Sequence, residues 1–199
     1  MKKYYSISLL TFIIMVLFAC LDSTSKTNQD SENDSFPLTF KEYQEPEDPD
    51  IPDQDEWTTV PRALQASFGS TDVRYSKSLP PNLEKTNSWR GTAWKGERIS
   101  AQIILWASGN AGRISLQTNG LENSTGDKID AGNVKAHFVR YVLTDEFGDK
   151  ADGCWDRKEE NLEVHLAADV IDKVETLEMQ TKTTRPVWVT IDAVSYTHL

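Results

Sequence analysis

From Trp57 onward, the apolar residues of this chain come in short stretches that turn-forming residues interrupt every few positions. A helix requires apolar residues three and four positions apart, whereas a strand requires them at every second position. The stretches are rich in β-branched and aromatic residues, which favours strands. They are residues 63–68, 73–79, 89–94, 98–107, 113–117, 134–143 and 187–191. The pattern predicts an all-β fold, an antiparallel β-sandwich that spans residues 57–193.

The segment 161–179 is open to two interpretations. Its apolar residues recur near a helical period, but the same stretch also fits two short strands around Ala168 and Asp169. We favour the two strands, because the rest of the domain shows strand spacing.

The first twenty residues have the organisation of a bacterial lipoprotein export signal. Two lysines precede an apolar run, residues 7–19, which is shorter than the roughly 18–20 residues that span a bilayer. The run ends in Leu-Phe-Ala-Cys, which is similar to a lipobox. We therefore expect residues 1–19 to be a signal peptide and Cys20 to carry the lipid anchor. The protein would then lie in the cell envelope, on the outer membrane, at its periplasmic or surface face. A plain signal peptide and an uncleaved anchor are the alternatives.

Residues 20–56 contain no pattern that would form a core. Ser, Thr, Asn and Asp dominate the first part, and prolines with acidic residues dominate the second. Prolines and like charges keep a chain extended and solvated. We expect a disordered acidic tether here. A calcium site is not expected, because no glycine turn would fix a ligand loop.

Composition argues against several classes of function. The net charge of −10 argues against nucleic acid as a partner, which would require a basic face. The chain has two cysteines, so a lipidated Cys20 leaves Cys154 without a disulfide partner, and we expect Cys154 to be buried and unreactive. No metal-ligand spacing and no phosphate-binding glycine loop is visible, so no metal and no cofactor is expected.

Two pairs of polar residues suggest catalysis and are not assigned to it. Asp145 and Glu146 are adjacent carboxylates, but neighbours on an extended chain point to opposite faces, and the pair leads into a glycine turn. A solvated hairpin turn is the expected role. His137 and His165 lie in strand-like stretches without further ligands at a useful spacing. No catalytic residue is therefore assigned to this chain.

Six tryptophans could supply surfaces that stack on sugars. Trp94, Trp106 and Trp188 lie in patterned stretches, so we expect them in the core. Trp155 has polar neighbours, and it is the tryptophan that we expect to contact carbohydrate if any does.

Three segments resemble the N-terminal domain of glycoside hydrolase family 123. Residues 89–102 read Trp-Arg-Gly-Thr-Ala-Trp-Lys-Gly-Glu-Arg-Ile-Ser-Ala-Gln, and in that family a tryptophan and a Lys-Gly-Glu turn precede a strand of this kind. Residues 168–172 and 183–191 are similar to two later motifs of the same domain. The three segments occur in the family's order, and the resemblance covers roughly residues 60–193.

The resemblance implies a non-catalytic β-sandwich module of an enzyme similar to β-N-acetylgalactosaminidases. In that family the catalytic domain is a TIM-like barrel that follows, and the substrate's own acetamido group acts as the nucleophile. A barrel aspartate orients that group and the adjacent glutamate is the acid/base. Neither residue can be placed on this chain. The implied partners are the downstream barrel of the same protein and an amino-sugar glycan.

The sequence departs from the family pattern at its end. The family continues with a turn and closing strands, whereas residues 193–199 read Ala-Val-Ser-Tyr-Thr-His-Leu. We interpret residues 194–199 as a non-native tail, and we expect a sandwich that is incomplete at its C-terminus and poorly stable without the closing strands. The alternative to a glycosidase module is a stand-alone carbohydrate-binding or adhesion lipoprotein.

Overall fold

The computed structural model describes residues 45–49, 54–122, 127–145 and 164–193. The described elements, in chain order, are η2 (Gln54–Thr59), β1 (Gln65–Gly69), β2 (Arg98–Ala107), β3 (Gly112–Ser115), β4 (Leu121–Glu122), β5 (Lys128–Ile129), η3 (Ala131–Asn133), β6 (Val134–Thr144), β7 (His165–Ile171), β8 (Thr176–Met179) and β9 (Thr183–Asp192). Both η elements are short 3-10 helices. Within the described residues no helix is long and apolar enough to cross a bilayer.

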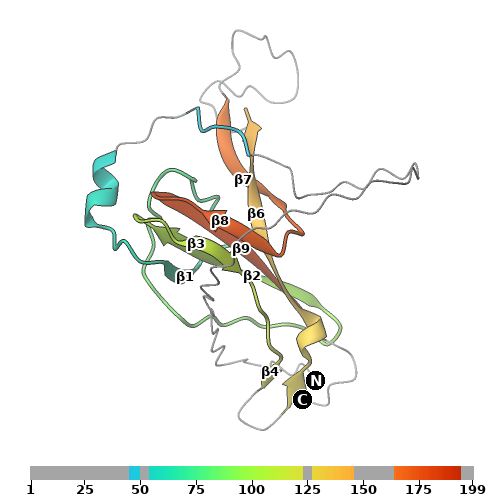
Figure 1. Ribbon diagram of the computed structural model, residues 1–199. Helices are drawn as coiled ribbons and strands as arrows, with labels where there is room; N and C mark the ends of the chain where they lie inside the picture. The colour runs from blue at the N-terminus through green and yellow to red at the C-terminus, as the bar shows by residue number, and fades with distance from the viewer. Residues whose placement is uncertain (1–44, 50–53, 123–126, 146–163, 194–199) are drawn as a thin grey trace, which may run out of the picture.

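The main sheet has five strands in the order β1-β2-β9-β6-β7, and each neighbouring pair is antiparallel. The pairs β3-β8 and β4-β5 form two smaller sheets. Figure 1 shows β3 and β8 lying across the main sheet, so the strands form layers. The all-β, sandwich-like architecture confirms the fold class that the strand spacing predicts.

Strand β2 lies near the centre of the main sheet and is buried on both faces. Its last seven residues, 101–107, are all buried, as expected for a strand that other elements cover on each side. Ile103 and Leu105 point to one face, and Ile104 and Trp106 point to the other. The two faces are covered by different parts of the chain.

The larger core fills the space between the main sheet and the two small sheets. Ile103 of β2 pairs with Val187 of β9, which pairs in turn with Phe138 of β6, so one apolar row crosses the sheet. Ile114 of β3 and Met179 of β8 pack onto this row from the small sheet. All five side chains are at most 4% exposed, and this burial supplies the main stabilisation of the domain.

The opposite face is covered by the segment in front of β1. We call this segment, residues 45–49 and 54–60, the N-terminal strap. Trp57 of the strap is 2% exposed and packs with Tyr75, Ile104 and Trp106. Its indole N–H donates to the carbonyl of Ser78 at 2.7 Å, which satisfies the polar atom of a buried tryptophan. The strap includes residues that sequence patterning places in the tether.

Several expected strands are present. Residues 98–107 and 134–143 correspond to β2 and β6, and the strand interpretation of 161–179 is confirmed by β7 and β8. The break between β7 and β8 lies at residues 172–175, later than Ala168 and Asp169. Residues 73–79 and 89–94 form loops instead of strands. In the first loop, the apparent alternation arises because Tyr75 packs into the second core while Val73 is 45% exposed.

Tryptophan burial differs from expectation at one position. Trp106 is buried, as expected, and Trp188 is half-buried against a small core cluster, but Trp94 is 59% exposed. The prediction of a core position for Trp94 is wrong because the residue lies in a turn, where no neighbouring strand covers it. Trp155, Cys154, Cys20 and the tail 194–199 lie outside the described residues.

Candidate functional site

The sheet splits where β6 separates from β9. The ladder between these strands runs from Val134–Ile191 to Phe138–Val187 and then ends, while β6 continues beside β7 as far as Thr144. The next residue of β9 is Pro186, which has no N–H to donate. Proline therefore limits the ladder, and the backbone of β6 beyond Phe138 needs other partners on this side.

The side chain of Arg185 supplies one of those partners. Its Nη1 donates to the carbonyl of Val139 at 3.0 Å, at the position where a residue with an N–H would have continued the ladder. The Arg185 side chain is 5% exposed, and its guanidinium lies 4.9 Å from the ring centroid of Tyr141. The Arg-Pro pair thus has a structural role, since proline ends the ladder and arginine replaces a lost hydrogen bond.

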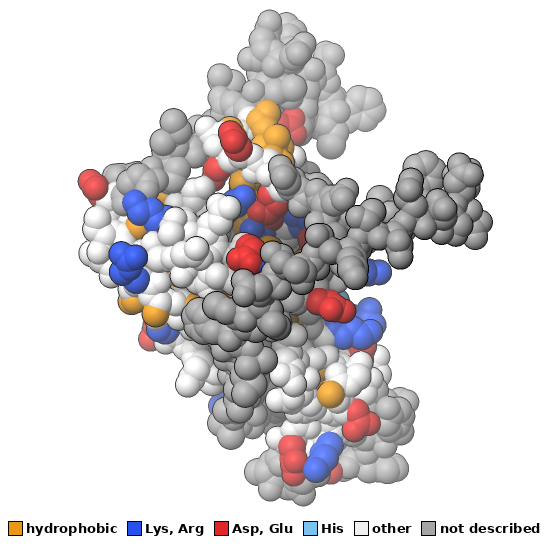
Figure 2. Space-filling view, viewed as in Figure 1, with side chains coloured by type: hydrophobic (Ala, Val, Ile, Leu, Met, Phe, Trp, Pro, Cys, Tyr) orange, Lys and Arg blue, Asp and Glu red, His pale blue; other side chains and the backbone are white. Residues whose placement is uncertain are grey.

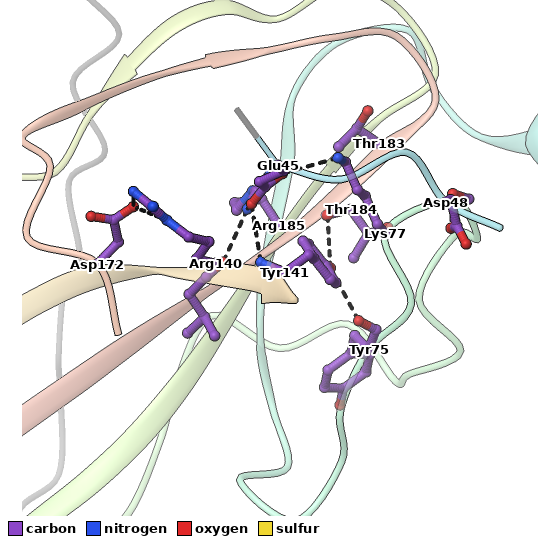
Figure 3. A network of polar contacts seen from close by, with 12 residues as sticks. Glu45, Asp48, Tyr75, Lys77, Arg140, Tyr141, Asp172, Thr183, Thr184 and Arg185 are labelled. Carbon is purple, nitrogen blue, oxygen red and sulfur yellow. Dashed lines mark hydrogen bonds and ion pairs between the residues drawn. The ribbon is translucent and has the colours of Figure 1, made fainter. Parts of the chain in front are cut away.

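Glu45 of the N-terminal strap supplies the second partner and completes a charge cluster (Figure 3). Its Oε1 accepts the backbone N–H of Tyr141 at 3.0 Å. Both carboxylate oxygens also accept from Arg185, with Oε2 to Nη2 at 2.7 Å, and Oε2 lies 3.0 Å from Nζ of Lys77. The carboxylate is 15% exposed and makes a bidentate, charge-assisted pair, which is the strongest class of side-chain contact. Glu45 therefore joins the strap to both β6 and β9.

The cluster changes the ionisation of Glu45. Burial alone would raise the pKa of its carboxyl group, but the hydrogen bonds and charge of Arg185, the Tyr141 N–H and the charge of Lys77 outweigh burial. Together they lower the pKa of Glu45 from 4.5 to about 2. Glu45 is thus held as a carboxylate and is unsuited to donate a proton near neutral pH.

Tyr141 is the buried centre of the cluster. Its phenol oxygen lies 3.0 Å from the carbonyls of both Tyr75 and Thr184, and the single hydroxyl proton can be donated to either. Burial raises the pKa of the Tyr141 phenol, and the nearby charge of Arg185 opposes the rise only in part. The phenol therefore stays protonated and donates a hydrogen bond from β6 to β9 or to the loop that contains Tyr75.

A second buried ion pair closes the β6–β7 hairpin. Arg140 of β6 donates from Nε and Nη2 to Oδ2 of Asp172, the Nε bond being 2.7 Å long, and the two side chains are 10% and 7% exposed. The N–H of Asp172 also donates to the carbonyl of Phe138 at 2.8 Å. In contrast, Asp169 forms an exposed pair with Arg74.

An open groove of about 1380 Å³ lies beside the cluster, between the strap and the segment from Asp172 to Thr183. Figure 2 shows acidic and basic side chains next to one another on this face of the molecule. Sugar sites present aromatic rings to their ligands, but Phe138, the aromatic residue among the described residues that line the groove, is 1% exposed. Among the described residues the groove therefore has no stacking platform, and we assign it no ligand.

The residues that sequence reasoning considered do not meet in this cluster. Asp145 follows the end of β6, and its neighbour Glu146 falls outside the described residues. His137 and His165 are half-buried in β6 and β7. In the part of the chain that the structure describes, no group of three or more His, Cys, Asp or Glu residues is placed to hold a metal ion.

The sequence analysis did not identify the cluster residues, because their local sequence surroundings do not distinguish them from other charged residues. Arg185 and Arg140 are charged residues inside strand stretches, and this signal could have marked them as paired. Glu45 could not be chosen from sequence, because Glu42, Glu45 and Glu47 are equivalent members of one acidic run. Only the fold brings Glu45 next to Arg185, which is 140 residues away in the chain.

Stability should depend on pH through Glu45. Because the folded-state pKa is about 2 and the ordinary value is 4.5, the stabilisation is complete above pH 4.5 and is lost as pH falls toward 2. We expect the difference in unfolding free energy between the wild type and Glu45→Gln to shrink over this range, as measured by urea unfolding at several pH values. An equal difference at every pH would contradict the assigned ionisation.

The sequence matches the family model described as the glycoside hydrolase 123 N-terminal domain over residues 68–198. Among solved structures it is similar to a family 123 glycoside hydrolase from Clostridium perfringens, studied for the hydrolysis of glycolipid glycans. The TM-score is 0.49 and the identity 20%, over 67% of this chain and 22% of that chain. This chain thus corresponds to about a fifth of the length of that enzyme. A search of curated proteins gave no match.

Proposed function

Because this chain belongs to the family of glycoside hydrolase 123 N-terminal domains, we propose that it forms the non-catalytic front module of an exported, lipid-anchored glycosidase. The match over residues 68–198 is the observation that carries the proposal. The resemblance implies that catalysis takes place in a following barrel, which uses the acetamido group of an amino-sugar glycan as nucleophile. The module would hold that barrel at a fixed position relative to its anchor.

The chemistry of the buried acids supports a non-catalytic role. A general acid of a glycosidase needs a raised carboxyl pKa, whereas that of Glu45 is lowered. The carboxylate of Asp172 is bonded to Arg140 and is 7% exposed. Both groups are thus engaged in contacts that join strands.

The purified 199-residue chain is expected to hydrolyse no aryl N-acetyl-β-galactosaminide, because it contains no assigned acid/base pair. The measurement is release of the aryl group over hours at high protein concentration. The matched variant is Asp145→Asn, which removes the described member of the adjacent carboxylate pair. If the wild-type chain hydrolyses the substrate and Asp145→Asn abolishes that hydrolysis, the non-catalytic role is refuted.

Anchoring is a separate part of the proposal. We propose that Cys20 is diacylated, because a single acyl chain gives only marginal membrane binding. Intact-mass analysis of the membrane fraction should show a lipid adduct that Cys20→Ala removes. Recovery of the wild-type protein in soluble form, cleaved at another position, would refute the lipid anchor.

A stand-alone carbohydrate-binding lipoprotein is the second candidate. One observation favours it, since Trp94 is 59% exposed and an exposed indole can stack on a sugar. The genomic sequence beyond the codon for Ala193 separates the two. A barrel with an adjacent Asp-Glu pair supports the glycosidase module, and a stop codon supports the binding protein.

A further inference from the structure

Beyond Phe138, strand β6 has a neighbouring strand on one side only. Its ladder with β9 ends at Phe138, whereas its ladder with β7 continues to Thr144. In an antiparallel sheet the N–H and carbonyl groups of every second residue point to the same side of a strand. On the β9 side, side chains bond to the carbonyl of Val139 and the N–H of Tyr141. The backbone groups of Leu143 point to this side as well, and no described strand pairs with them there.

An apolar surface adjoins this free edge. Leu143 is 49% exposed and Val164 is 43% exposed. Leu143 pairs with Leu166 of β7, and Val164 lies two residues before Leu166, so the three side chains share one face of the two strands. Tyr141 and Leu166 are buried on that face. Figure 2 shows hydrophobic side chains at the end of the molecule where β6 and β7 project in Figure 1. Large aliphatic side chains next to a free strand edge are typical of a surface that another segment covers.

The chain has a segment of suitable chemistry directly before the strap. Residues 36–43 read Phe-Pro-Leu-Thr-Phe-Lys-Glu-Tyr. Phe36, Leu38 and Phe40 alternate with other residues, as in a strand with one apolar face. Pro37 suits an outer strand, where the missing N–H needs no partner. Composition assigns this segment to the tether, because polar and acidic residues lie on both sides of it.

Glu45 brings the end of this segment to the free edge. Its carboxylate accepts the N–H of Tyr141, and Leu143 is two residues further along β6, about 7 Å away. Tyr43 and Phe40 precede Glu45 by two and five residues, and five residues span up to roughly 17 Å. Both aromatic side chains are therefore within reach of Leu143.

The last residues of the 199-residue chain are too far away to cover the same edge. Ile191 of β9 pairs with Val134, at the opposite end of β6. Leu143 is nine residues from Val134, which corresponds to about 30 Å along the strand. Residues 194–199 span at most roughly 20 Å. Protection of Leu143 in this chain therefore cannot come from them.

We propose that residues 40–44 dock along the free edge of β6. In this arrangement Phe40 and Tyr43 cover the exposed side chain of Leu143. Because Glu45 is already held in place, docking orders few further residues, and the segment is present at a high effective concentration. Main-chain hydrogen bonds to Leu143 provide affinity and the apolar side chains provide specificity, as when a peptide adds to the edge of a sheet. The folded module then extends upstream of the strap.

Hydrogen exchange at the amide of Leu143 in the 199-residue chain tests the inference. In the wild type this amide should be protected, and in the double variant Phe40→Ser with Tyr43→Ser it should exchange at least about tenfold faster. Lys41→Ser is the matched control, because it changes a residue between the two aromatic ones, and it should leave the exchange unchanged. The amide of Val189, inside the β2–β9 ladder, should keep its protection in every variant.

Each other result overturns the inference in a different way. An unprotected Leu143 amide in the wild type would show that nothing docks on this edge. Equal protection in the wild type and the double variant would show that a different segment covers it. Protection that disappears on dilution would make a second copy of the chain the partner. An equal loss in Lys41→Ser would exclude a contact made by the aromatic rings. A loss at Val189 in the double variant would show that the segment supports the whole sheet instead of this edge.

Discussion

Replacing Glu45 by glutamine is expected to lower the free energy of unfolding by about 3 kcal/mol at neutral pH. The variant keeps the shape of the side chain and removes its charge, so Arg185, which is 5% exposed, loses its carboxylate partner. Removal of one member of a buried pair costs about 3–5 kcal/mol, and partial exposure of Glu45 favours the lower end. The fall in the pKa of Glu45 from 4.5 to about 2 gives a similar value, roughly 3 kcal/mol. Urea unfolding measures the change.

The matched control is Glu47→Gln, two residues away in the same acidic segment. Glu47 is exposed, so this change should alter the free energy of unfolding by less than about 0.5 kcal/mol. The double variant Glu45→Gln with Arg185→Met should recover part of the lost stability, because it removes the uncompensated charge. Equal effects of the two single glutamine variants would mean that the strap does not dock through Glu45.

Replacing Trp57 by alanine is expected to lower the free energy of unfolding by about 3–5 kcal/mol, the range for large-to-small changes at buried aromatic positions. The indole is 2% exposed and packs on Ile104 and Trp106, so its loss opens a cavity on the second face of the sheet. It also leaves the carbonyl of Ser78 without its donor. Thermal or urea unfolding of the wild type and the variant measures the effect.

Trp94→Ala is the control for this prediction, since it removes the same side chain from an exposed turn. In the 199-residue chain we expect it to change stability by less than about 0.5 kcal/mol. If both tryptophan variants behave alike, the second core is not formed by the strap.

Short-range patterns sufficed for most of the fold. The spacing of apolar residues placed β2 and β6, which have neighbouring strands on both sides, and it favoured strands for β7 and β8, because in each case the pattern reports burial. The same reasoning failed for residues 73–79 and 89–94. There, contacts of loops with the sheet bury Tyr75 and partly bury Trp89, and these two stretches form no ladder of backbone hydrogen bonds. Local spacing does not distinguish these two causes of burial.

Local sequence patterns could not predict the charge cluster, and the reason is different. Its members come from the strap, from the loop that contains Lys77, and from β6 and β9, and they are neighbours only after the sheet has formed. Composition placed Glu45 in a solvated tether, because acidic residues and prolines surround it. The structure shows that one carboxylate of that run, Glu45, forms an ion pair with Arg185, the residue before Pro186. The need for a partner arises from Pro186, whose effect on the β6–β9 ladder depends on strand order.

The strap also bears on where the module begins. The family match starts at residue 68, within β1, whereas contacts with the sheet begin at Glu45. Trp57 covers one face of β2, and Glu45 fills the gap between β6 and β9. We infer that residues 45–49 and 54–60 belong to the folded module, although composition places most of them in the tether.

Hydrogen exchange at the amide of Tyr141 tests this account most directly. That N–H donates to Glu45 at 3.0 Å, at the position where β9 no longer pairs with β6, so its protection reports docking of the strap. In Glu45→Gln we expect it to exchange at least about tenfold faster than in the wild type, as for a local opening made easier by about 1.4 kcal/mol. The amide of Val189, inside the β2–β9 ladder, should change less, and Glu47→Gln should change neither. A Tyr141 amide that exchanges equally slowly in the wild type and in Glu45→Gln would contradict the account.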